Sequence, residues 1–304
     1  MKIGVIGVGN WGHRVIGEYI DLKNEKLIDD VYVCESNKKI LKEYSKNKNI
    51  KTNNDYVNLL ESNCVDAIHV CVPNILHYDV AKTAIENGVH VLMEKPLTKT
   101  SLEAYKLIEL ASERGIVLEV GHIYRFANIM RKLKRMITED YFGDIQYMTF
   151  KWTTKLNSAE ESALKHVDIV WDLMPHILDM IHFLTDKWPT ESNVLRNGRQ
   201  ISFLNLIYDD FLVNIELSWT TQERKRELRL IASERSARVQ CVKQTMHVYE
   251  NGKENDINPG ANNTIREEAL NFINSINNKR MLYNSHIIGA RNVSVIEKIL
   301  QDNK

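Results

Sequence analysis

Hydrophobic residues in the first part of the chain gather into short continuous runs, separated by segments with helical spacing. The runs are rich in Val and Ile and predict strands at 3–8, 31–35, 67–72, 89–94 and 116–121. The segments between them predict helices at 10–23, 37–46, 54–62, 74–87 and 101–114, the last with Ser101 as a candidate cap. Continuous apolar strands are typical of a parallel sheet that is covered on both faces. The alternation therefore predicts an α/β domain over residues 1–122, with a doubly wound parallel sheet and right-handed crossovers.

The pattern changes after residue 122, where alternating runs replace the continuous ones. Helices are predicted at 125–140 and 172–184, and strands at 144–155, 201–208, 211–219, 226–232, 237–242 and 246–249. Asp209-Asp210 predicts a hairpin turn between two of these strands. Closing helices are predicted at 264–277 and 285–302, the last of them able to pack back on the first domain. Residues 123–304 are therefore predicted to form an α+β domain with a mainly antiparallel sheet.

Composition narrows the class of protein. The chain has 304 residues, with 40 Lys and Arg against 40 Asp and Glu, so its formal net charge is zero. This balance argues against a general nucleic-acid binder and against a polybasic membrane-surface protein. No apolar run approaches the roughly 20 residues of a membrane-spanning helix, and the N-terminal residues predict a strand and turn, not a signal peptide. The four cysteines form no CxxC pair, so we expect no zinc ribbon or disulfide framework, and a cytoplasmic protein with reduced thiols.

A glycine motif lies between the first predicted strand and the first predicted helix. It is Gly7-Val8-Gly9-Asn10-Trp11-Gly12, a GxGxxG sequence in the context that dinucleotide binding requires. Gly7 permits a tight turn, Gly9 lets the backbone approach a pyrophosphate, and Gly12 allows close packing of helix and strand. The free N–H groups of the helix N-terminus favour phosphate. The alternative is a plain glycine turn in an α/β protein.

Glu35 ends the second predicted strand, 23 residues after Gly12. An acid at about this offset binds the adenosine ribose hydroxyls in dinucleotide-binding domains. A carboxylate there would repel a 2′-phosphate, so NAD is favoured over NADP. Lys38 and Lys39 lie near enough to leave NADP open. The alternative role for Glu35 is to cap the helix that follows Ser36.

Three further motifs carry polar residues. Open α/β sheets bind ligands beyond the carboxyl ends of their strands, and two of the motifs follow predicted strands there, where a nicotinamide should lie. The third motif opens a helix in the second domain. The motifs are Val72-Pro73-Asn74-x-x-His77, Glu94-Lys95-Pro96 and Asp172-x-x-x-His176-x-x-Asp179. The candidate cofactor-binding residues are thus Gly7, Gly9, Asn10, Trp11, Gly12, Glu35, Val72, Pro73, Asn74, His77, Glu94 and Lys95.

With these motifs in this order and spacing, the chain resembles the Gfo/Idh/MocA oxidoreductases over nearly its whole length. The resemblance implies a Rossmann domain, a second domain with a large open sheet, and hydride transfer between a nicotinamide and a sugar-like alcohol. It also implies that Lys95, Asp172 and His176 are catalytic, and that the protein is a homodimer or homotetramer. The sequence departs from the family at Val72, where Thr is common, and at Lys165-His166, where a Gly-rich turn is common.

Lys95, Asp172 and His176 also suit the oxidation of an alcohol on chemical grounds alone, independently of the family resemblance. Oxidation of an alcohol needs a base for the hydroxyl proton, and an imidazole titrates near working pH. His176 is expected in the first turns of its helix, where the dipole favours the neutral ring. Lys95 would stabilise the developing alkoxide, and Asp172 would orient the site or contact substrate, so no metal is required. The alternatives are an N-cap for Asp172, a core histidine for His176 and a solvated loop lysine for Lys95.

The stretch Gly121-His122-Ile123-Tyr124-Arg125-Phe126 is similar to the GHxxRF stretch of sugar-nucleotide dehydrogenases in this family, including those that oxidise the 3-hydroxyl of UDP-N-acetylglucosamine. Arg125 and the cluster at 224–226 could pair with a diphosphate, and Tyr124 or Trp152 could stack on a sugar. The alternatives are an interdomain ion pair for Arg125 and a solvated strand face for the cluster. The candidate substrate-binding residues are His122, Tyr124, Arg125, Trp152, Asp172, His176 and Arg226.

Two rival functions stay open. One is a dehydrogenase of the same kind that acts on a free polyol, inositol or aldose. The other is a non-catalytic NAD-binding sensor, which should have lost the catalytic side chains that are present here. In either case a flat sheet exposed on one face would be expected to pair with another subunit.

Overall fold

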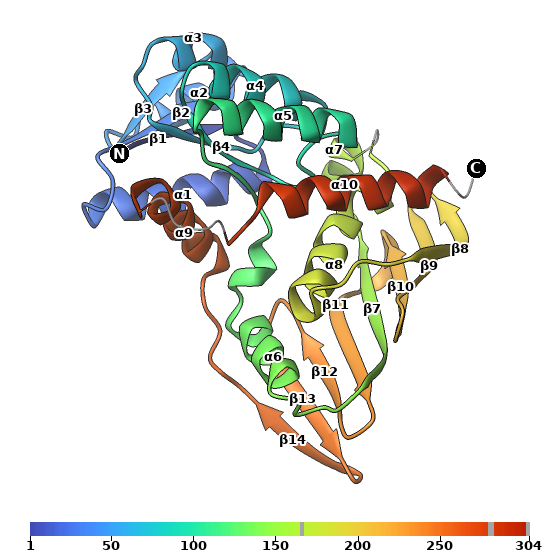
Figure 1. Cartoon of the computed structure of the whole chain (residues 1–304). Helices are drawn as coiled ribbons and strands as arrows, with labels where there is room; N and C mark the ends of the chain where they lie inside the picture. The colour runs from blue at the N-terminus through green and yellow to red at the C-terminus, as the bar shows by residue number, and fades with distance from the viewer. Residues whose placement is uncertain (165–166, 279–282, 302–304) are drawn as a thin grey trace. The chain divides into compact units, whose positions relative to one another are not determined.

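The computed structural model describes residues 1–164, 167–278 and 283–301 (Figure 1). The chain divides into two compact units. The first unit contains Met1–His122 and Ile265–Ser294, and the second contains Ile123–Thr264 and Val295–Lys304. The division after residue 122 falls where the sequence pattern changes. Residues 265–294, which the sequence places with the second domain, group with the first unit.

The first unit is built on a six-stranded parallel sheet with the order β3-β2-β1-β4-β5-β6. This order confirms the doubly wound sheet that the apolar runs predict. The edge strand β3 was not predicted, because two of its residues are exposed and its sequence is mostly polar. The strands are β1 (Lys2–Ile6), β2 (Asp30–Cys34), β3 (Ile50–Asn53), β4 (Ala67–Val70), β5 (His90–Met93) and β6 (Leu118–Val120).

Helices cover this sheet. A helix from the C-terminal part of the chain, α9, packs in the same core as the first helix, α1. Tyr19 of α1 and Phe272 of α9 are fully buried in one cluster with Val5 of β1, which explains why residues 265–294 belong to the first unit. Thr100, not Ser101, caps α5, in a capping box with Glu103. The helices are α1 (Asn10–Asn24), α2 (Lys38–Tyr44), α3 (Tyr56–Glu61), η1 (Asn74–Leu76), α4 (His77–Glu86), α5 (Ser101–Arg114), α9 (Thr264–Asn278) and α10 (His286–Gln301), which belongs to this unit only as far as Ser294.

The second unit is built on an eight-stranded sheet with the order β14-β13-β12-β11-β7-β10-β9-β8. β7 and β10 are parallel and the other neighbours are antiparallel, so the predicted mainly antiparallel sheet is confirmed. The polar edge strands β8 and β14 were not predicted. The strands are β7 (Ile145–Lys155), β8 (Glu191–Gly198), β9 (Ile201–Ile207), β10 (Leu212–Ser218), β11 (Thr220–Ala232), β12 (Ser236–Gln240), β13 (Thr245–Glu250) and β14 (Lys253–Ile257).

The core of the second unit lies between this sheet and its helices. Ile177 of α8 is fully buried in one cluster with Phe150 of β7 and Leu228 of β11. No helix in the described ranges combines the length and the apolar character that a membrane span needs. The helices of the second unit are η2 (Ile123–Phe126), α6 (Asn128–Thr138), α7 (Ser158–Ala163) and α8 (Ile169–Thr185).

Candidate active site

The three glycines of the turn after β1 differ in the space around them. Gly7 has a φ of +94°, and a Cβ there would lie 2.8 Å from the backbone of Cys71. A Cβ on Gly12 would lie 2.1 Å from the carbonyl oxygen of Gly7. In contrast, a Cβ on Gly9 would meet no atom within 4 Å. Gly7 and Gly12 are therefore needed for packing, and the open space at Gly9, next to the N-terminus of α1, fits a phosphate group.

Glu35 braces this turn from the end of β2. Its carboxylate accepts hydrogen bonds from the backbone N–H of Val8 at 3.0 Å and from that of Asn37 at 2.8 Å. The side chain of Asn37, not that of Glu35, caps α2. Glu35 is therefore not the N-cap of α2. Its carboxylate lies beside the glycine turn, where a ribose-binding acid is expected.

The loops after β4 and β5 are joined by His77. This side chain is buried, with Nδ1 2.8 Å from the carbonyl oxygen of Pro96 and Nε2 3.0 Å from that of Val72. Burial lowers the pKa of His77, although the two carbonyl groups favour the charged ring. His77 thus acts as a support for the two loops. Contacts of Val72, Pro73 and Asn74 with the dinucleotide stay predictions.

Glu94 and Lys95 follow β5 directly. Glu94 is buried, and its Oε1 accepts a hydrogen bond from the indole N–H of Trp11 and lies 3.3 Å from Nε2 of His69. A Cβ on Gly121 would lie 3.1 Å from the same carboxylate, so a larger side chain would crowd it. Lys95 itself is half-buried. The strand end that carries Lys95 is therefore tied to the helix that follows the glycine turn.

In the second unit, α8 begins three residues before Asp172. Asp168 caps the helix, because its side chain accepts a hydrogen bond from the backbone N–H of Val170. Asp172 is therefore not the N-cap, and the predicted start of this helix was wrong. Asp172 and His176 are spaced i, i+4 on one helix face, and both are half-buried where their neighbours Leu173 and Ile177 are buried.

Two aromatic rings hold the imidazole of His176. The ring of Tyr124 packs edge-on at a centroid distance of 5.3 Å, and that of Trp152 packs tilted at 5.5 Å. His176 lies seven residues after Ile169, the first residue of α8. The predicted place in the first turns was therefore wrong, and since a helix dipole acts mainly on the first turn, it has little influence on this ring. The contacts with Tyr124 and Trp152 restrict the orientation of the His176 ring.

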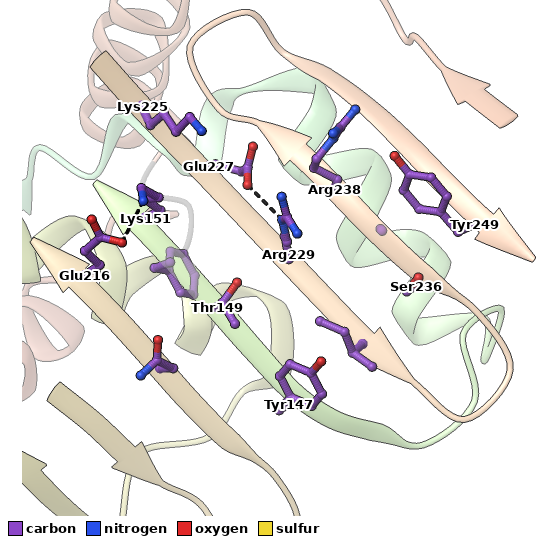
Figure 2. Close-up of a pocket in the computed structure, with 14 residues that line it drawn as sticks. Tyr147, Thr149, Lys151, Glu216, Lys225, Glu227, Arg229, Ser236, Arg238 and Tyr249 are labelled. Carbon is purple, nitrogen blue, oxygen red and sulfur yellow. Dashed lines mark hydrogen bonds and ion pairs between the residues drawn. The ribbon is translucent and has the colours of Figure 1, made fainter. Parts of the chain in front are cut away.

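Arg226 belongs to the same group. Its guanidinium lies over the ring of Trp152 at 5.2 Å and donates to the carbonyl oxygen of Thr153 at 3.1 Å. Burial lowers the pKa of Arg226. Lys225, one residue earlier in β11, points to the other face of the sheet, lines a hollow of about 520 Å³ there (Figure 2) and pairs with Glu223 at 3.0 Å. The basic run at 224–226 is therefore not one patch.

Arg125 is buried and paired. Its guanidinium nitrogens lie 2.7 to 3.0 Å from the carboxylate oxygens of Asp179, and it also lies over the ring of Phe183 at 5.4 Å. Arg125, Asp179 and Phe183 all belong to the second unit, so this ion pair is not interdomain. The pair anchors η2, which carries Tyr124, to α8, which carries His176. A substrate contact by Arg125 stays a prediction.

The remaining predicted residues differ in what surrounds them. His122 is buried at the end of the first unit. Lys165 and His166 lie outside the described residues. Sequence reasoning missed His69, which contacts Glu94, and gave Asp179 no partner. A polar residue inside the apolar run 67–72 was the signal for His69.

Comparison with known proteins identifies the first unit. A family model described as "Oxidoreductase family, NAD-binding Rossmann fold" (GFO_IDH_MocA) matches residues 1–122. Residues 1–122 therefore match the NAD-binding Rossmann domain of the Gfo/Idh/MocA oxidoreductase family. The assignment agrees with the glycine turn, the position of Glu35 and the order of the parallel strands.

Relatives of the chain include sugar and sugar-nucleotide dehydrogenases. It is 26% identical over 307 residues to UDP-N-acetylglucosamine 3-dehydrogenase of Acidithiobacillus ferrooxidans, covering 96% of this chain and 93% of the relative. It is 24% identical over 218 residues to scyllo-inositol 2-dehydrogenase (NADP(+)) IolW of Bacillus subtilis, covering 69% of this chain and 60% of the relative.

Solved structures show the same fold over nearly the whole chain. The UDP-N-acetylglucosamine 3-dehydrogenase GnnA of Acidithiobacillus ferrooxidans superposes with a TM-score of 0.85 at 24% identity, covering 98% of this chain and 96% of that one. An oxidoreductase from Agrobacterium radiobacter in complex with NAD+, L-tartaric acid and magnesium gives 0.84 at 13% identity, covering 100% and 97%.

Proposed function

We propose that this oxidoreductase transfers a hydride between NAD and a secondary hydroxyl of a sugar nucleotide, with the 3-hydroxyl of a UDP-N-acetylhexosamine as the first candidate. The observation that carries the proposal is the group in the second unit where Tyr124 and Trp152 pack on His176, with Arg226 over Trp152. This group brings together a candidate base (His176), two aromatic rings and a cation (Arg226) in direct contact with one another. The relative from Acidithiobacillus ferrooxidans, matched over 96% of this chain, supports the choice of substrate class.

Each catalytic role follows from the chemistry of the side chain. When bound at the glycine turn, NAD would supply a nicotinamide as the hydride acceptor. His176 takes the hydroxyl proton on its imidazole, because an imidazole titrates near working pH and can act as a general base. Asp172, one helical turn earlier, accepts a hydrogen bond from the ring or from a neighbouring sugar hydroxyl. Lys95 donates to the reacting oxygen and stabilises the charge that develops there.

Arg226 is the cation we assign to the substrate diphosphate. Its guanidinium uses one nitrogen for backbone carbonyl groups at 2.8 and 3.1 Å, and a guanidinium has further N–H donors for phosphate oxygens. Partial burial strengthens such a pair, because the competing water is reduced. Tyr124 and Trp152 offer ring faces and edges on which a sugar can pack.

One assay separates the proposal from its rivals. Purified protein is incubated with NAD+ and either UDP-sugars or the matching free sugars, polyols and inositols, and NADH formation is followed by absorbance. We expect turnover with a UDP-sugar and none with the free sugars. Turnover only with a free polyol, inositol or aldose would make the protein a dehydrogenase of that class. Tight NADH binding with no turnover on either set would overturn the proposal in favour of a sensor.

We also infer that a second copy of the chain covers the exposed face of the eight-stranded sheet. Ile207, Leu212, Tyr147 and Ile231 lie directly opposite one another on neighbouring strands and form an apolar row, in which the first three are 36, 41 and 43% exposed. Beside the row, Lys151 pairs with Glu216 on the same face (Figure 2). A face that carries apolar groups and both charges can match itself in a two-fold dimer. A homodimer or homotetramer, in the cytoplasm, is the assembly we propose.

A further inference from the structure

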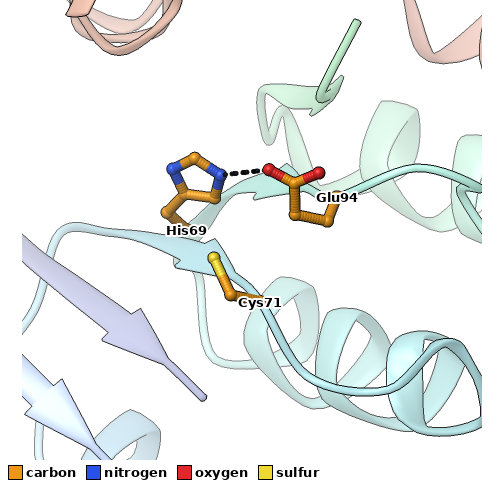
Figure 3. A group of neighbouring side chains, drawn as sticks. All are labelled: His69, Cys71 and Glu94. Atoms are coloured by element: carbon orange, nitrogen blue, oxygen red, sulfur yellow. Dashed lines mark hydrogen bonds and ion pairs between the residues drawn. The ribbon is translucent and has the colours of Figure 1, made fainter. Parts of the chain in front are cut away.

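The first unit contains a compact group of three different metal-binding side chains. Figure 3 shows His69, Cys71 and Glu94 close together, and the ligand atoms of the three all lie within 4.8 Å of one another. His69 and Cys71 are two residues apart along one strand direction, so both point to the same face of the sheet. Val70 is opposite Met93 in the register, which puts Cys71 next to Glu94. The sheet itself therefore brings the three together.

The surroundings of this group are acidic. The hydroxyl of Tyr19 lies 3.4 Å from Nδ1 of His69. The carboxyl groups of Glu268 and Glu119 lie close enough to Tyr19 to interact with it electrostatically. Both of these glutamates are fully buried. These carboxyl groups can ionise when a positive ion binds nearby, and attraction between opposite charges is strong in an interior of low dielectric.

We propose that His69, Cys71 and Glu94 form a binding site for a thiophilic divalent transition-metal ion such as Zn²⁺. Nitrogen, sulfur and carboxylate oxygen are the donor set that zinc takes in proteins, and three protein ligands leave a fourth position for water. His69 binds through Nε2, while its Nδ1–H donates to the Tyr19 hydroxyl and holds the ring in place. Cys71 binds as the thiolate, so its S–H bond breaks, a metal–sulfur bond forms and the proton passes to solvent. No oxidation or reduction is involved.

The proposed ion would act on dinucleotide binding. Oε1 of Glu94 already accepts the indole N–H of Trp11, and Trp11 belongs to the glycine motif. An ion that takes Glu94 as a ligand competes with that hydrogen bond and loosens the link between the turn and the end of β5. Metal and dinucleotide should therefore weaken each other's binding by the same factor. This consequence rests on the NAD-binding role of the turn, whereas the site itself does not.

Cobalt provides the direct test, because a thiolate bound to Co²⁺ gives a charge-transfer band in the near ultraviolet. Co²⁺ is titrated into the full-length protein, free of dinucleotide and kept reduced. We expect a saturable band that Zn²⁺ removes by competition. Cys71→Ser should lose the band, whereas Cys64→Ser, at the other half-buried cysteine of the first unit, should keep it. Absence of a saturable band in the wild-type protein, or its survival in Cys71→Ser, would refute the site.

A second variant guards against a folding defect. Glu94→Gln keeps the shape of the side chain and leaves the cysteine in place, so a charge-transfer band should remain, with affinity for Co²⁺ lowered by roughly tenfold or more. Circular dichroism checks that each variant is folded. Unchanged Co²⁺ affinity in folded Glu94→Gln would exclude the carboxylate as a ligand and with it the three-residue site. Titration of NADH with and without Zn²⁺ then tests the opposition between the two ligands, independently of any substrate.

Discussion

The indole N–H of Trp11 donates a hydrogen bond to the carboxylate of Glu94, across 83 positions of the chain. The bond joins the helix behind the glycine turn to the strand end that carries Lys95. Trp11→Phe removes the donor, keeps an aromatic ring and leaves a buried carboxylate with one partner fewer. Since a hydrogen bond to a charged group contributes about 1.5–3 kcal/mol, we expect NADH affinity to fall by roughly tenfold or more.

Fluorescence titration of NADH checks this expectation. Trp188→Phe, at a partly buried tryptophan of the second unit, is the matched control and should bind NADH as the wild-type protein does. Equal NADH affinity in Trp11→Phe and the wild-type protein would show that the bond does not position the turn.

His176→Ala should remove the base from the second unit while the first unit, which binds the dinucleotide, stays intact. General-base catalysis contributes roughly 10²- to 10⁴-fold, so kcat should fall by a factor in that range with little change in NADH affinity. Steady-state kinetics and NADH titration measure the two quantities separately. A kcat close to that of the wild-type protein would remove His176 from the mechanism.

Glu35 should decide between the two dinucleotides. Its carboxylate lies beside the glycine turn and would repel a 2′-phosphate, so the wild-type protein should bind NADH more tightly than NADPH. Glu35→Ser should narrow or reverse this ratio. Binding of both reduced dinucleotides to both proteins is measured by fluorescence. Tighter binding of NADPH than of NADH by the wild-type protein would contradict the assignment.

Glu119 should make the stability of the protein depend on pH. Burial raises the pKa of this carboxyl group to about 7, against about 4.3 for an ordinary glutamate. The folded protein therefore binds more protons than the unfolded chain between these values, and stability is lost as pH rises from about 4 to 7. One pKa unit corresponds to 1.36 kcal/mol, so the loss is up to about 3.5 kcal/mol.

Glu119→Gln keeps a neutral side chain at every pH. We expect it to be more stable than the wild-type protein at pH 8 and similar to it at pH 5, by urea unfolding. Glu109→Gln, at an exposed position of α5, should show neither effect. An equal difference between Glu119→Gln and the wild-type protein at both pH values would argue against titration of this group.

Leu212 lies in the middle of the apolar row on the exposed sheet face, opposite both Ile207 and Tyr147. Leu212→Lys places a charge there, which a second copy could bury only at a large cost. Light scattering after size-exclusion chromatography should show a shift to monomer. Leu195→Lys, at a leucine of β8 that is 65% exposed, is the control and should keep the wild-type mass. A mass unchanged by Leu212→Lys would place the subunit contact elsewhere.

The sequence predicts the first unit well, because its strands are buried on both faces and their apolar runs are continuous. It fails at the polar edge strands β3, β8 and β14, which bury too little surface to leave a pattern. It also misplaces the start of α8, because Asp168 and Asp172 are both acceptable caps and only the fold selects between them.

Contacts between residues that are far apart in the sequence could not be predicted, because they depend on the tertiary fold and leave no local pattern. Arg125 and Asp179 are 54 positions apart, and nothing local to either one indicates its partner. The motifs pointed to the side chains of the candidate site, but not to the aromatic packing that orients His176. The alternation along β11 could have separated Lys225 from Arg226, but the predicted strand began at residue 226, whereas β11 begins at Thr220.

The return of residues 265–294 to the first unit has a consequence for the order of events on the ribosome. Tyr19, near the start of the chain, is fully buried in a cluster whose Phe272 is made late. A nascent chain that has emerged only as far as residue 122 would contain every strand of the parallel sheet. The apolar residues that α9 later covers would still be exposed to solvent. The unit that is translated first therefore completes its core only after residues 123–264 of the second unit have been translated.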